Sequence, residues 1–453
     1  MRVRIRVLVA LTVAFAAARA EAIPAFARKY GMSCTACHVA WPILNQQGQN
    51  FRDNGYRFKL GKDDPVTVSP AYVPLSLRTT AAYQYTRTTN QPSDQGPITT
   101  QSGGVPLPPG VDLLSAGTIS DDVSYLVVVT GFSPSDNAAF VESAWARLDD
   151  LGGTGWLNAK IGKFELDQPA SSHRGITLTS GYAVYGAHPA GSLVGFDLGE
   201  NQVGVELDGH DARSLTRYSI SLVSANGAES GSTFASRNAW SAPLLYAHVQ
   251  KAFELDSAVL PWVRLGALGA VGWWPTSFST LTPSPPPGET VPEQPQIVPG
   301  TGADHKRYYR AGAELSWMLG YPSTPAFFTV SYINGREEAG LAPSDQGSGD
   351  ANHFNGGFAE VDWVPFTSSS YDATPWVFFA RYDLVRYARG PGDLDGGTFG
   401  IRRYLALGPR ASAAVHAEFH VDRVRGVGWV DPATNQALDV VTQAAMLGLD
   451  FDF

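Results

Sequence analysis

Alternating polarity is the feature that most limits how this chain can fold. From Leu75 onward, runs of about ten residues alternate apolar and polar side chains, and each run ends in Gly, Pro or Asp turn residues. An alternation with period two places the apolar side chains on one face of a β-strand and the polar side chains on the other. The sequence therefore predicts an all-β protein. The sixteen runs are centred on Ala82, Ser115, Val128, Ala146, Ala159, Val205, Ile220, Ala247, Ala267, Ala313, Val330, Val361, Phe379, Ile401, Ala417 and Leu447.

The segments that connect these runs alternate between short and long. Membrane β-barrels have short turns at one end and long outer loops at the other. We therefore expect a 16-stranded antiparallel outer-membrane β-barrel over residues 71–453. A β-sandwich also has alternating strands and is the alternative, although it does not require this rhythm. The long segments are residues 89–110, 166–201, 275–304, 338–351 and 425–439, and the short turns include residues 120–122, 152–153, 209–211 and 254–256.

The last run illustrates the two faces expected of a barrel strand. Leu447 and Leu449 share one face, whereas Met446 and Asp450 share the other. The first face suits lipid and the second suits a wet lumen. The terminal Phe453 resembles the sorting signal that ends outer-membrane barrels.

The N-terminus predicts export from the cytoplasm. Arg2, Arg4 and Arg6 precede an apolar stretch, residues 7–17, and small residues that suit a cleavage site follow it. We interpret residues 1–22 as a signal peptide. No later stretch of about eighteen apolar residues occurs, which argues against a membrane-spanning helix. The net charge of −9 argues against a nucleic-acid partner, since phosphates require clustered Lys and Arg.

The only two cysteines belong to the sequence Cys34-Thr35-Ala36-Cys37-His38. This is the Cys-X-X-Cys-His pattern of c-type haem attachment, in which two thiols bind the vinyl groups and the imidazole binds the iron. A disulfide, a thioredoxin-type redox pair and a zinc site are the alternatives. No second Cys/His pair has zinc spacing, and no βαβ pattern surrounds the motif. The sequence therefore predicts one covalently bound haem c, with His38 as the proximal iron ligand.

The sixth iron ligand is left open by the sequence. Met32 lies two residues before Cys34 and is chemically suitable, because a Met opposite a His raises the potential of a haem. Its closeness to the motif makes the opposite face of the haem hard to reach. Met446, Met318 and several histidines are rivals, and the iron could also be five-coordinate or bind water.

The residues around the motif carry a second signal. They are Ile23-Pro24-Ala25-Phe26-Ala27-Arg28, Gly31-Met32, Trp41-Pro42-Ile43-Leu44-Asn45, Gly48, Phe51 and Gly55-Tyr56. This stretch resembles the N-terminal haem segment of the fused outer-membrane monohaem cytochrome-porins of iron(II)-oxidising bacteria. The resemblance is specific over residues 23–58 and implies one haem, a porin barrel and electron entry from outside the cell. Related cytochrome-porins with an undefined electron donor share the segment.

Residues 23–70 form a segment too short to bury a haem without help. The lumen of a sixteen-stranded barrel is wide enough to hold a plug. We therefore expect a mostly helical haem segment that docks in the lumen or at the periplasmic mouth of its own barrel. A free domain that swings on residues 61–74 is the alternative.

Ionisable residues on lumen-facing strands are further candidates for a site. His416, Glu418 and His420 share one face of a strand, and Met446 can join them from a neighbouring strand. These residues could contact the haem or a ferrous ion, and the alternative is a hydrated polar wall. Three pairs are interpreted as such wall pairs: Arg381 with Asp383, Glu360 with Asp362, and Arg310 with Glu314.

These expectations combine into an electron conduit in the bacterial outer membrane. An extracellular reductant, by resemblance Fe(II), would pass electrons through the haem to a periplasmic acceptor cytochrome. The protein is then at most an Fe(II):cytochrome c oxidoreductase, and no proton-transfer or nucleophilic constellation is visible. A solute porin with a haem-bearing plug or redox gate is the alternative. A small-molecule redox enzyme, such as a peroxidase, is a third possibility.

Overall fold

The computed structural model describes residues 25–32, 34–40, 42–58, 65, 74–105, 110–131, 140–189, 191–225, 242–276, 278–281, 296–299, 304–320, 324–341, 352–365, 376–388, 391–407 and 412–452. The predicted signal peptide, residues 1–22, and the terminal Phe453 lie outside these ranges.

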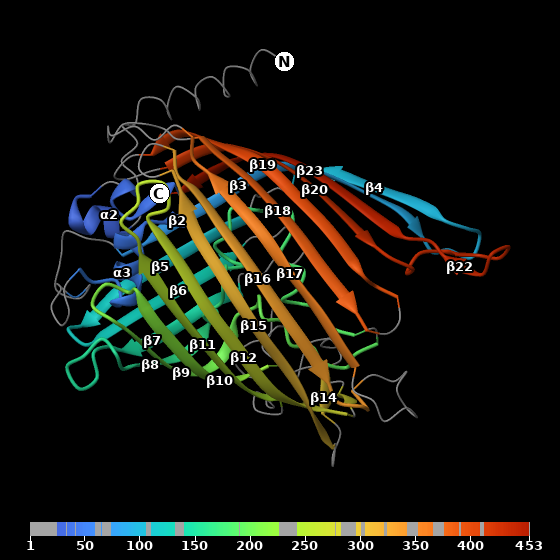
Figure 1. The fold of residues 1–453 in the computed structure, drawn as a ribbon, viewed down its shortest axis with the longest axis horizontal. Coiled ribbons are helices and arrows are strands. Elements are labelled where there is room, and N and C mark those ends of the chain that lie inside the picture. Colours follow the sequence, from blue (N-terminus) through green and yellow to red (C-terminus); the bar gives the residue numbers. More distant parts are fainter. Residues whose placement is uncertain are drawn as a thin grey trace, which may run out of the picture.

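Sixteen antiparallel strands close into a single barrel, in which β23 pairs with β3 (Figure 1). Each predicted run centre falls within one of these strands, so the number and order of the barrel strands are confirmed, and the sandwich alternative is wrong. The strands are β3 (Ser76–Gln91), β5 (Gly110–Ser120), β6 (Val123–Gly131), β7 (Phe140–Leu148), β8 (Asn158–Phe164), β9 (Gln202–His210), β10 (Thr216–Ser224), β11 (Pro243–Glu254), β12 (Trp262–Pro275), β15 (His305–Leu319), β16 (Ala326–Glu337), β17 (Asn352–Trp363), β18 (Trp376–Tyr387), β19 (Leu394–Leu407), β20 (Ser412–Val424) and β23 (Val440–Asp452).

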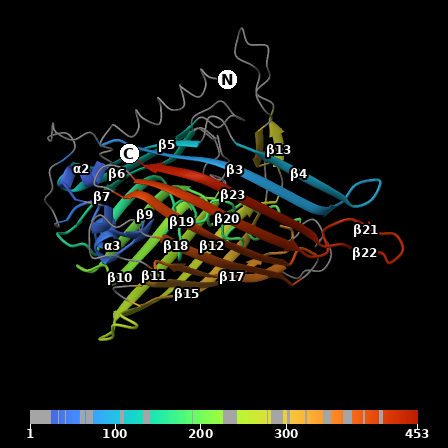
Figure 2. The same cartoon turned by 90° about the horizontal axis from the view of Figure 1, so that it is seen from above.

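One additional strand, β4 (Ile98–Gly104), shares an edge of β3 with β5. β4 pairs with the later part of β3, with Gln84 opposite Gly104, whereas β5 pairs with the first five residues of β3. The β3–β4 hairpin extends beyond the barrel, beside the small hairpin of β21 (Val430–Asp431) and β22 (Gln436–Ala437) (Figure 2). A further small hairpin consists of β13 (Phe278–Leu281) and β14 (Gln296–Pro299).

The two faces of the barrel wall are inverted relative to a water-soluble protein. On β23, Leu447 is 60% exposed and Leu449 is 41% exposed, whereas Met446 and Asp450 are buried. The same alternation along the other strands gives an apolar outer surface and a polar inner surface. The predicted division of the last strand into a lipid face and a lumen face is therefore confirmed in burial. An apolar exterior of this extent requires a non-aqueous environment.

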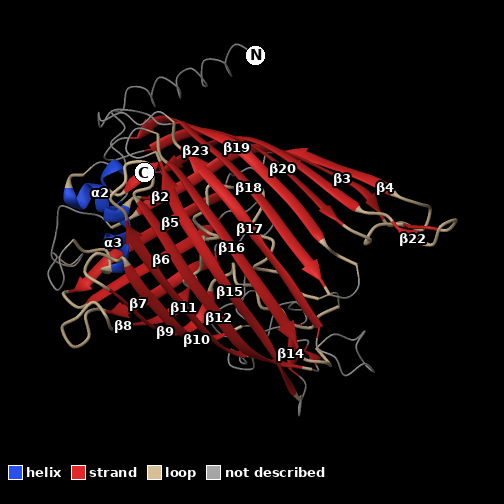
Figure 3. Cartoon of the chain, in the orientation of Figure 1, coloured by secondary structure: helices blue, strands red, loops and turns tan. Residues whose placement is uncertain are grey.

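The N-terminal residues form short helices at one end of the barrel (Figure 3). They are α2 (Ala25–Tyr30), the 3₁₀ turn η1 (Cys34–Ala36) and α3 (Gln46–Asp53), with β1 (His38–Ala40) and β2 (Ile43–Leu44) paired between them. Asn45 caps α3, because its side-chain oxygen accepts a hydrogen bond from Gly48 N at 2.9 Å. Among the described residues, no helix is long and apolar enough to cross a membrane.

Aromatic rings give this N-terminal part a small core of its own. Phe26 stacks on Tyr56 with a centroid distance of 4.9 Å, and Phe51 lies 4.7 Å from Phe58. Tyr30 packs edge-on against Phe58 at 4.7 Å. These contacts bring the ends of the segment together around α3.

The segment between β8 and β9 lies inside the barrel. We refer to its described residues, 165–189 and 191–201, as the inner loop. The expectation that residues 166–201 form an outer loop is wrong, because their apolar side chains need burial and the lumen supplies it. These side chains pack against the inner wall in one cluster, which includes Leu166, Tyr182, Val184, Tyr185, Val194, Phe196 and Leu198 of the loop and Tyr246, Tyr308, Phe354 and Phe358 of the wall.

Candidate functional site

The Cys-X-X-Cys-His motif forms a compact turn between α2 and α3. Cys34 begins η1, and Cys37 N donates a hydrogen bond to Cys34 O at 3.1 Å, which closes one turn between the two cysteines. Both cysteines are present as thiols, so the disulfide alternative is wrong for this structure. His38 follows directly as the first residue of β1.

Helix α3 packs closely against this turn. Asn45 Nδ2 donates to Ala36 O at 3.0 Å, which ties the start of α3 to the motif. A Cβ atom at Gly48 would lie 2.1 Å from the carbonyl oxygen of Cys37. Only glycine therefore fits at this position, and the requirement explains the single glycine within α3.

An apolar wall surrounds the first cysteine. Cys34 and Ala40 are buried in one cluster with side chains of the barrel and of the inner loop. Val39 and Ile43 pack against the same cluster. The barrel contributes Val364, Val377, Phe379, Tyr404 and Ala414, and the inner loop contributes Ile176.

Burial sets the protonation of the motif. Desolvation, with a smaller contribution from the charge of Asp452, raises the pKa of the Cys34 thiol to about 12, and desolvation also raises the pKa of Cys37. Desolvation lowers the pKa of His38 to about 4, against the opposing effect of the Pro42 backbone. A redox-active thiol pair needs lowered thiol pKa values, so this environment does not favour the thioredoxin-type alternative. His38 is neutral at pH 7, which is the form that binds metals.

One imidazole nitrogen of His38 has no hydrogen-bond partner. Its Nδ1 atom is buried and forms no hydrogen bond with a described residue. A buried polar atom left without a partner costs about 1–3 kcal/mol. Such an atom in a folded protein usually marks a site that holds a ligand, an ion or a water molecule.

Arg57 joins the N-terminal segment to the barrel. Its side chain is completely buried and donates to Asp121 O at 2.6 Å and to Asp150 Oδ2 at 2.8 Å. Its Nε also donates to Asn54 O at 2.9 Å, which holds the turn after α3. Asp121 and Asp150 belong to two neighbouring turns of the barrel, so this one guanidinium connects three segments.

A second group of contacts fixes the end of α3. Arg147 on β7 donates to the backbone oxygen of Asp53 at 2.8 Å and to Asp149 Oδ1 at 2.6 Å. Gly55 has a φ of +70°, and a Cβ atom there would lie 2.7 Å from Asp149 Oδ1. The described residues 25–58 thus contact the inner wall through both apolar and charged groups, unlike the expectation for a free, tethered domain.

The predicted lumen cluster on β20 anchors the inner loop. Glu418 accepts hydrogen bonds from Leu178 N at 2.9 Å and from Thr179 N at 2.8 Å, and it contacts His416 Nε2 at 3.0 Å. His420 binds Thr398 Oγ1 at 2.8 Å. The described residues contain no group of three or more His, Cys, Asp or Glu side chains that could hold a metal ion. The shared buried face of these residues is as predicted. Glu418 is committed to the inner loop, whereas His416 pairs with Glu418 and Asp450, and His420 pairs with Asp422.

The three methionine candidates lie on different parts of the chain, and Met318 is buried on β15. Met32 is half-buried after α2, and its backbone N donates to Ala27 O at 3.1 Å. Met446 is buried on β23 opposite Glu418 in the strand register. Ligation of the iron by any of these methionines stays a prediction.

The three predicted wall pairs have different outcomes. Glu360 accepts a hydrogen bond from Tyr182 and not from Asp362. Arg381 pairs with Asp383 at 2.7 Å, as expected, and also donates to the inner loop at Ser180 Oγ. The pairing of Arg310 with Glu314 is wrong. Arg310 instead binds Glu337 at 3.0 Å, and His188 of the inner loop binds the same carboxylate. Glu314 accepts a hydrogen bond from Gln250.

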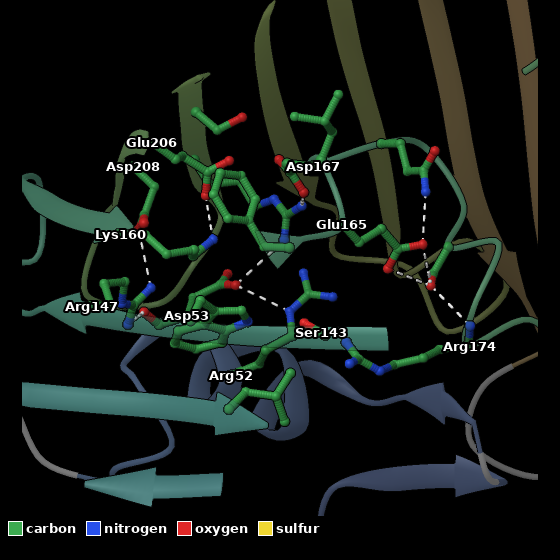
Figure 4. Close-up of a pocket in the computed structure, with 18 of the residues that line it drawn as sticks. Arg52, Asp53, Ser143, Arg147, Lys160, Glu165, Asp167, Arg174, Glu206 and Asp208 are labelled. Atoms are coloured by element: carbon green, nitrogen blue, oxygen red, sulfur yellow. Dashed lines mark hydrogen bonds and ion pairs between the residues drawn. The ribbon is translucent and has the colours of Figure 1, made fainter. Parts of the chain in front are cut away.

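A polar cavity of about 220 Å³ lies between α3, the start of the inner loop and the inner wall of β7 to β12 (Figure 4). Asp53, Arg147, Asp208 and Arg217 all line it. Asp53 is held by Arg217 at 3.4 Å and by Gln49 Nε2 at 2.7 Å. Sequence reasoning missed this cavity, because its lining comes from segments that are distant in the sequence.

No protein-family model matches the sequence, and no curated protein matches it. Similar solved structures include a loop L8 deletion mutant of OmpT, an outer membrane protein of Vibrio cholerae, with 10% identity, a TM-score of 0.45 and coverage of 84% of this chain and 99% of that chain. An anion-selective porin from Comamonas acidovorans has 8% identity and a TM-score of 0.49, over 84% of this chain and 99% of that chain. OprB of Pseudomonas putida has 10% identity and a TM-score of 0.46, over 83% and 94%. At these identities and TM-scores the likeness carries no information on function.

Proposed function

We propose that this chain is an outer-membrane electron conduit that carries one covalently attached haem c on Cys34, Cys37 and His38. An extracellular reductant, Fe(II) by the resemblance noted above, donates electrons, and a periplasmic cytochrome accepts them. The apolar exterior of the barrel supports the membrane location. The predicted signal peptide and the resemblance over residues 23–58 support the outer membrane of a bacterium.

The motif residues fit a covalent haem. Both cysteines are thiols within one turn, and the neighbouring imidazole is neutral with a nitrogen that lacks a partner. Cys34 and Cys37 would hold the porphyrin by thioether bonds, and His38 would bind its iron. When bound, the haem supplies one-electron redox chemistry. Apolar side chains of the barrel and the inner loop exclude water on the side of Cys34.

The single observation that carries this proposal is the seating of the motif against the barrel wall. Cys34 shares a buried cluster with Phe379 and Ala414 of the barrel. Arg57 fixes the same segment to two barrel turns. A redox centre held rigidly within a membrane protein can move electrons while the oxidised metal stays outside. The inner loop packs against the inner wall and the N-terminal segment lies at one end of the barrel, which favours a conduit over an open pore.

Stopped-flow spectroscopy tests the proposal. The oxidised protein is mixed with Fe(II) and the haem α-band is followed. We expect reduction in the wild type and its loss in His38→Ala. His353→Ala is the matched control, because His353 is an exposed histidine on β17. Failure of Fe(II) to reduce the protein at any tolerated pH would contradict iron oxidation, and unchanged haem reduction in His38→Ala would contradict iron ligation by His38.

A solute porin with a haem-bearing plug is the second candidate. The polar cavity beside α3 favours it, because such a space can hold water and small solutes. Planar-bilayer recordings separate the two functions. A nearly closed wild-type channel supports the conduit, whereas large currents that persist in a Cys34→Ser, Cys37→Ser variant support the porin.

A further inference from the structure

Some of the charged side chains that line the polar cavity beside α3 belong to no ion pair with another described residue. Six basic and six acidic side chains line it. The acidic ones are Asp53, Glu142, Glu165, Asp167, Glu206 and Asp208. Side chains from α3, the barrel wall and the inner loop all extend into this space (Figure 4).

Each of the six carboxylates already has a donor. Asp167 pairs with Arg217 and His248, and Glu206 pairs with Lys160. Asp208 binds Arg147 at 3.1 Å. The other three accept hydrogen bonds as well: Gln49 donates to Asp53, Thr130 to Glu142, and Ser171 and the Ser172 N–H to Glu165.

Three guanidinium groups keep unused donors. Within the described residues, the side chains of Arg174 and Arg264 form no ion pair, and Arg264 only stacks on Trp262 at 5.1 Å. Arg52 meets its sequence neighbour Asp53 at 3.4 Å with its side chain 38% exposed. The charges of Arg217 and Arg52 oppose that of Arg264, whereas those of Glu314 and Asp53 favour it. The charged side chains of the cavity that lack a close partner among the described residues are therefore arginines.

The cavity also contains buried polar atoms without partners. Arg217 Nε and Ser219 Oγ are two such donors, on side chains that are at least nine-tenths buried. Buried groups of this kind require water or a polar ligand. The others that line the cavity are Gln168 Oε1, Asn201 Oδ1 and Asp208 Oδ2.

We propose that this cavity is a binding site for a small oxyanion of the phosphate or carboxylate class. Arg174 from the inner loop and Arg52 from α3 extend toward it from opposite sides (Figure 4), and Arg264 lines it from β12. Guanidinium groups suit this ligand class because their forked N–H donors match two oxygens of an oxyanion. The site uses none of the three motif residues, so it adds a function to the electron transfer proposed above. Because the lining spans α3 and the barrel, a bound anion also joins the two.

Isothermal titration calorimetry of the complete, detergent-solubilised protein with inorganic phosphate tests the site, in a chloride buffer of low ionic strength. We expect saturable binding with one phosphate per chain. Arg174→Gln and Arg264→Gln should each weaken it by at least about tenfold, since each removes a charged hydrogen-bond donor. Arg307→Gln is the matched control, because this exposed arginine pairs with Glu338 away from the cavity.

Loss of binding in Arg174→Gln would not be explained by misfolding, because the Arg174 side chain makes no ion pair in the described part of the chain. Unchanged strand content by circular dichroism should accompany its loss of binding. Absence of saturable binding up to about 10 mM phosphate overturns the proposal. Equal binding by wild type and both cavity variants overturns it as well.

Discussion

Replacing Arg57 by Ala tests whether the N-terminal segment is a fixed part of the barrel. The side chain is fully buried and binds Asp150 at 2.8 Å, Asp121 O at 2.6 Å and Asn54 O at 2.9 Å. Removing one partner of a buried ion pair costs about 3–5 kcal/mol, because the remaining charge stays buried. Asp149 retains Arg147 at 2.6 Å, so the loss falls mainly on Asp150 and on the two carbonyl oxygens. We therefore expect undocking of the segment to become more favourable by about 3 kcal/mol or more.

Native-state hydrogen exchange of α3 measures this change. Since 1.4 kcal/mol is a factor of ten, the opening equilibrium should rise by about two powers of ten or more. Arg213→Ala is the control, because the exposed Arg213–Glu254 pair should contribute less than about 1 kcal/mol. Retained heat-modifiable mobility on gels would confirm an intact barrel. Unchanged exchange of α3 in Arg57→Ala would refute the view that Arg57 holds the segment in place.

Three further predictions concern the inner loop, the motif and the outer surface. Glu418→Ala should release the inner loop, because it removes the acceptor of two loop N–H groups at a cost of about 3 kcal/mol. The rate of tryptic cleavage after Arg174 should rise. The control Glu254→Ala, at an exposed position, should leave that rate unchanged. Gly48→Ala should lower the haem α-band absorbance per protein, because its Cβ would lie 2.1 Å from Cys37 O, and exposed Gln47→Ala should not. Leu447 is 60% exposed on the outer face. Leu447→Arg should lower the free energy of unfolding in lipid vesicles by about 2–4 kcal/mol, the cost of an arginine at the bilayer midplane. An unchanged free energy of unfolding would contradict contact with lipid.

Residue periodicity identified the barrel because strand faces are a local property. Val205 and Leu207 point outward and Glu206 inward simply because successive side chains of a strand alternate. The same local logic applies to Cys34, Cys37 and His38, since covalent haem attachment requires these residues at fixed spacing. The attachment itself stays a prediction.

The inner loop shows where local patterns fail. Its length suggested an outer loop, but its content of buried apolar residues, such as Tyr182, Val184 and Phe196, was a usable signal. A solvent-exposed loop would leave these side chains in water at a cost of about 1.5–3 kcal/mol each for the larger ones. Hydrophobicity of the loop, considered together with its length, could have predicted that it folds inward.

The sequence by itself determined the strands, their number, their faces and the motif, because each depends on residues within about ten positions of one another. Only the tertiary structure decided the pairing of Arg57 with Asp150, of Arg310 with Glu337 and of Glu418 with the inner loop. Glu418 lies 240 residues from Leu178 and contacts it across the lumen. Closure of the barrel brings such distant positions together, and several inward-facing charges then compete for each partner. Which pair forms depends on which groups are buried side by side, and no local sequence pattern contains that information.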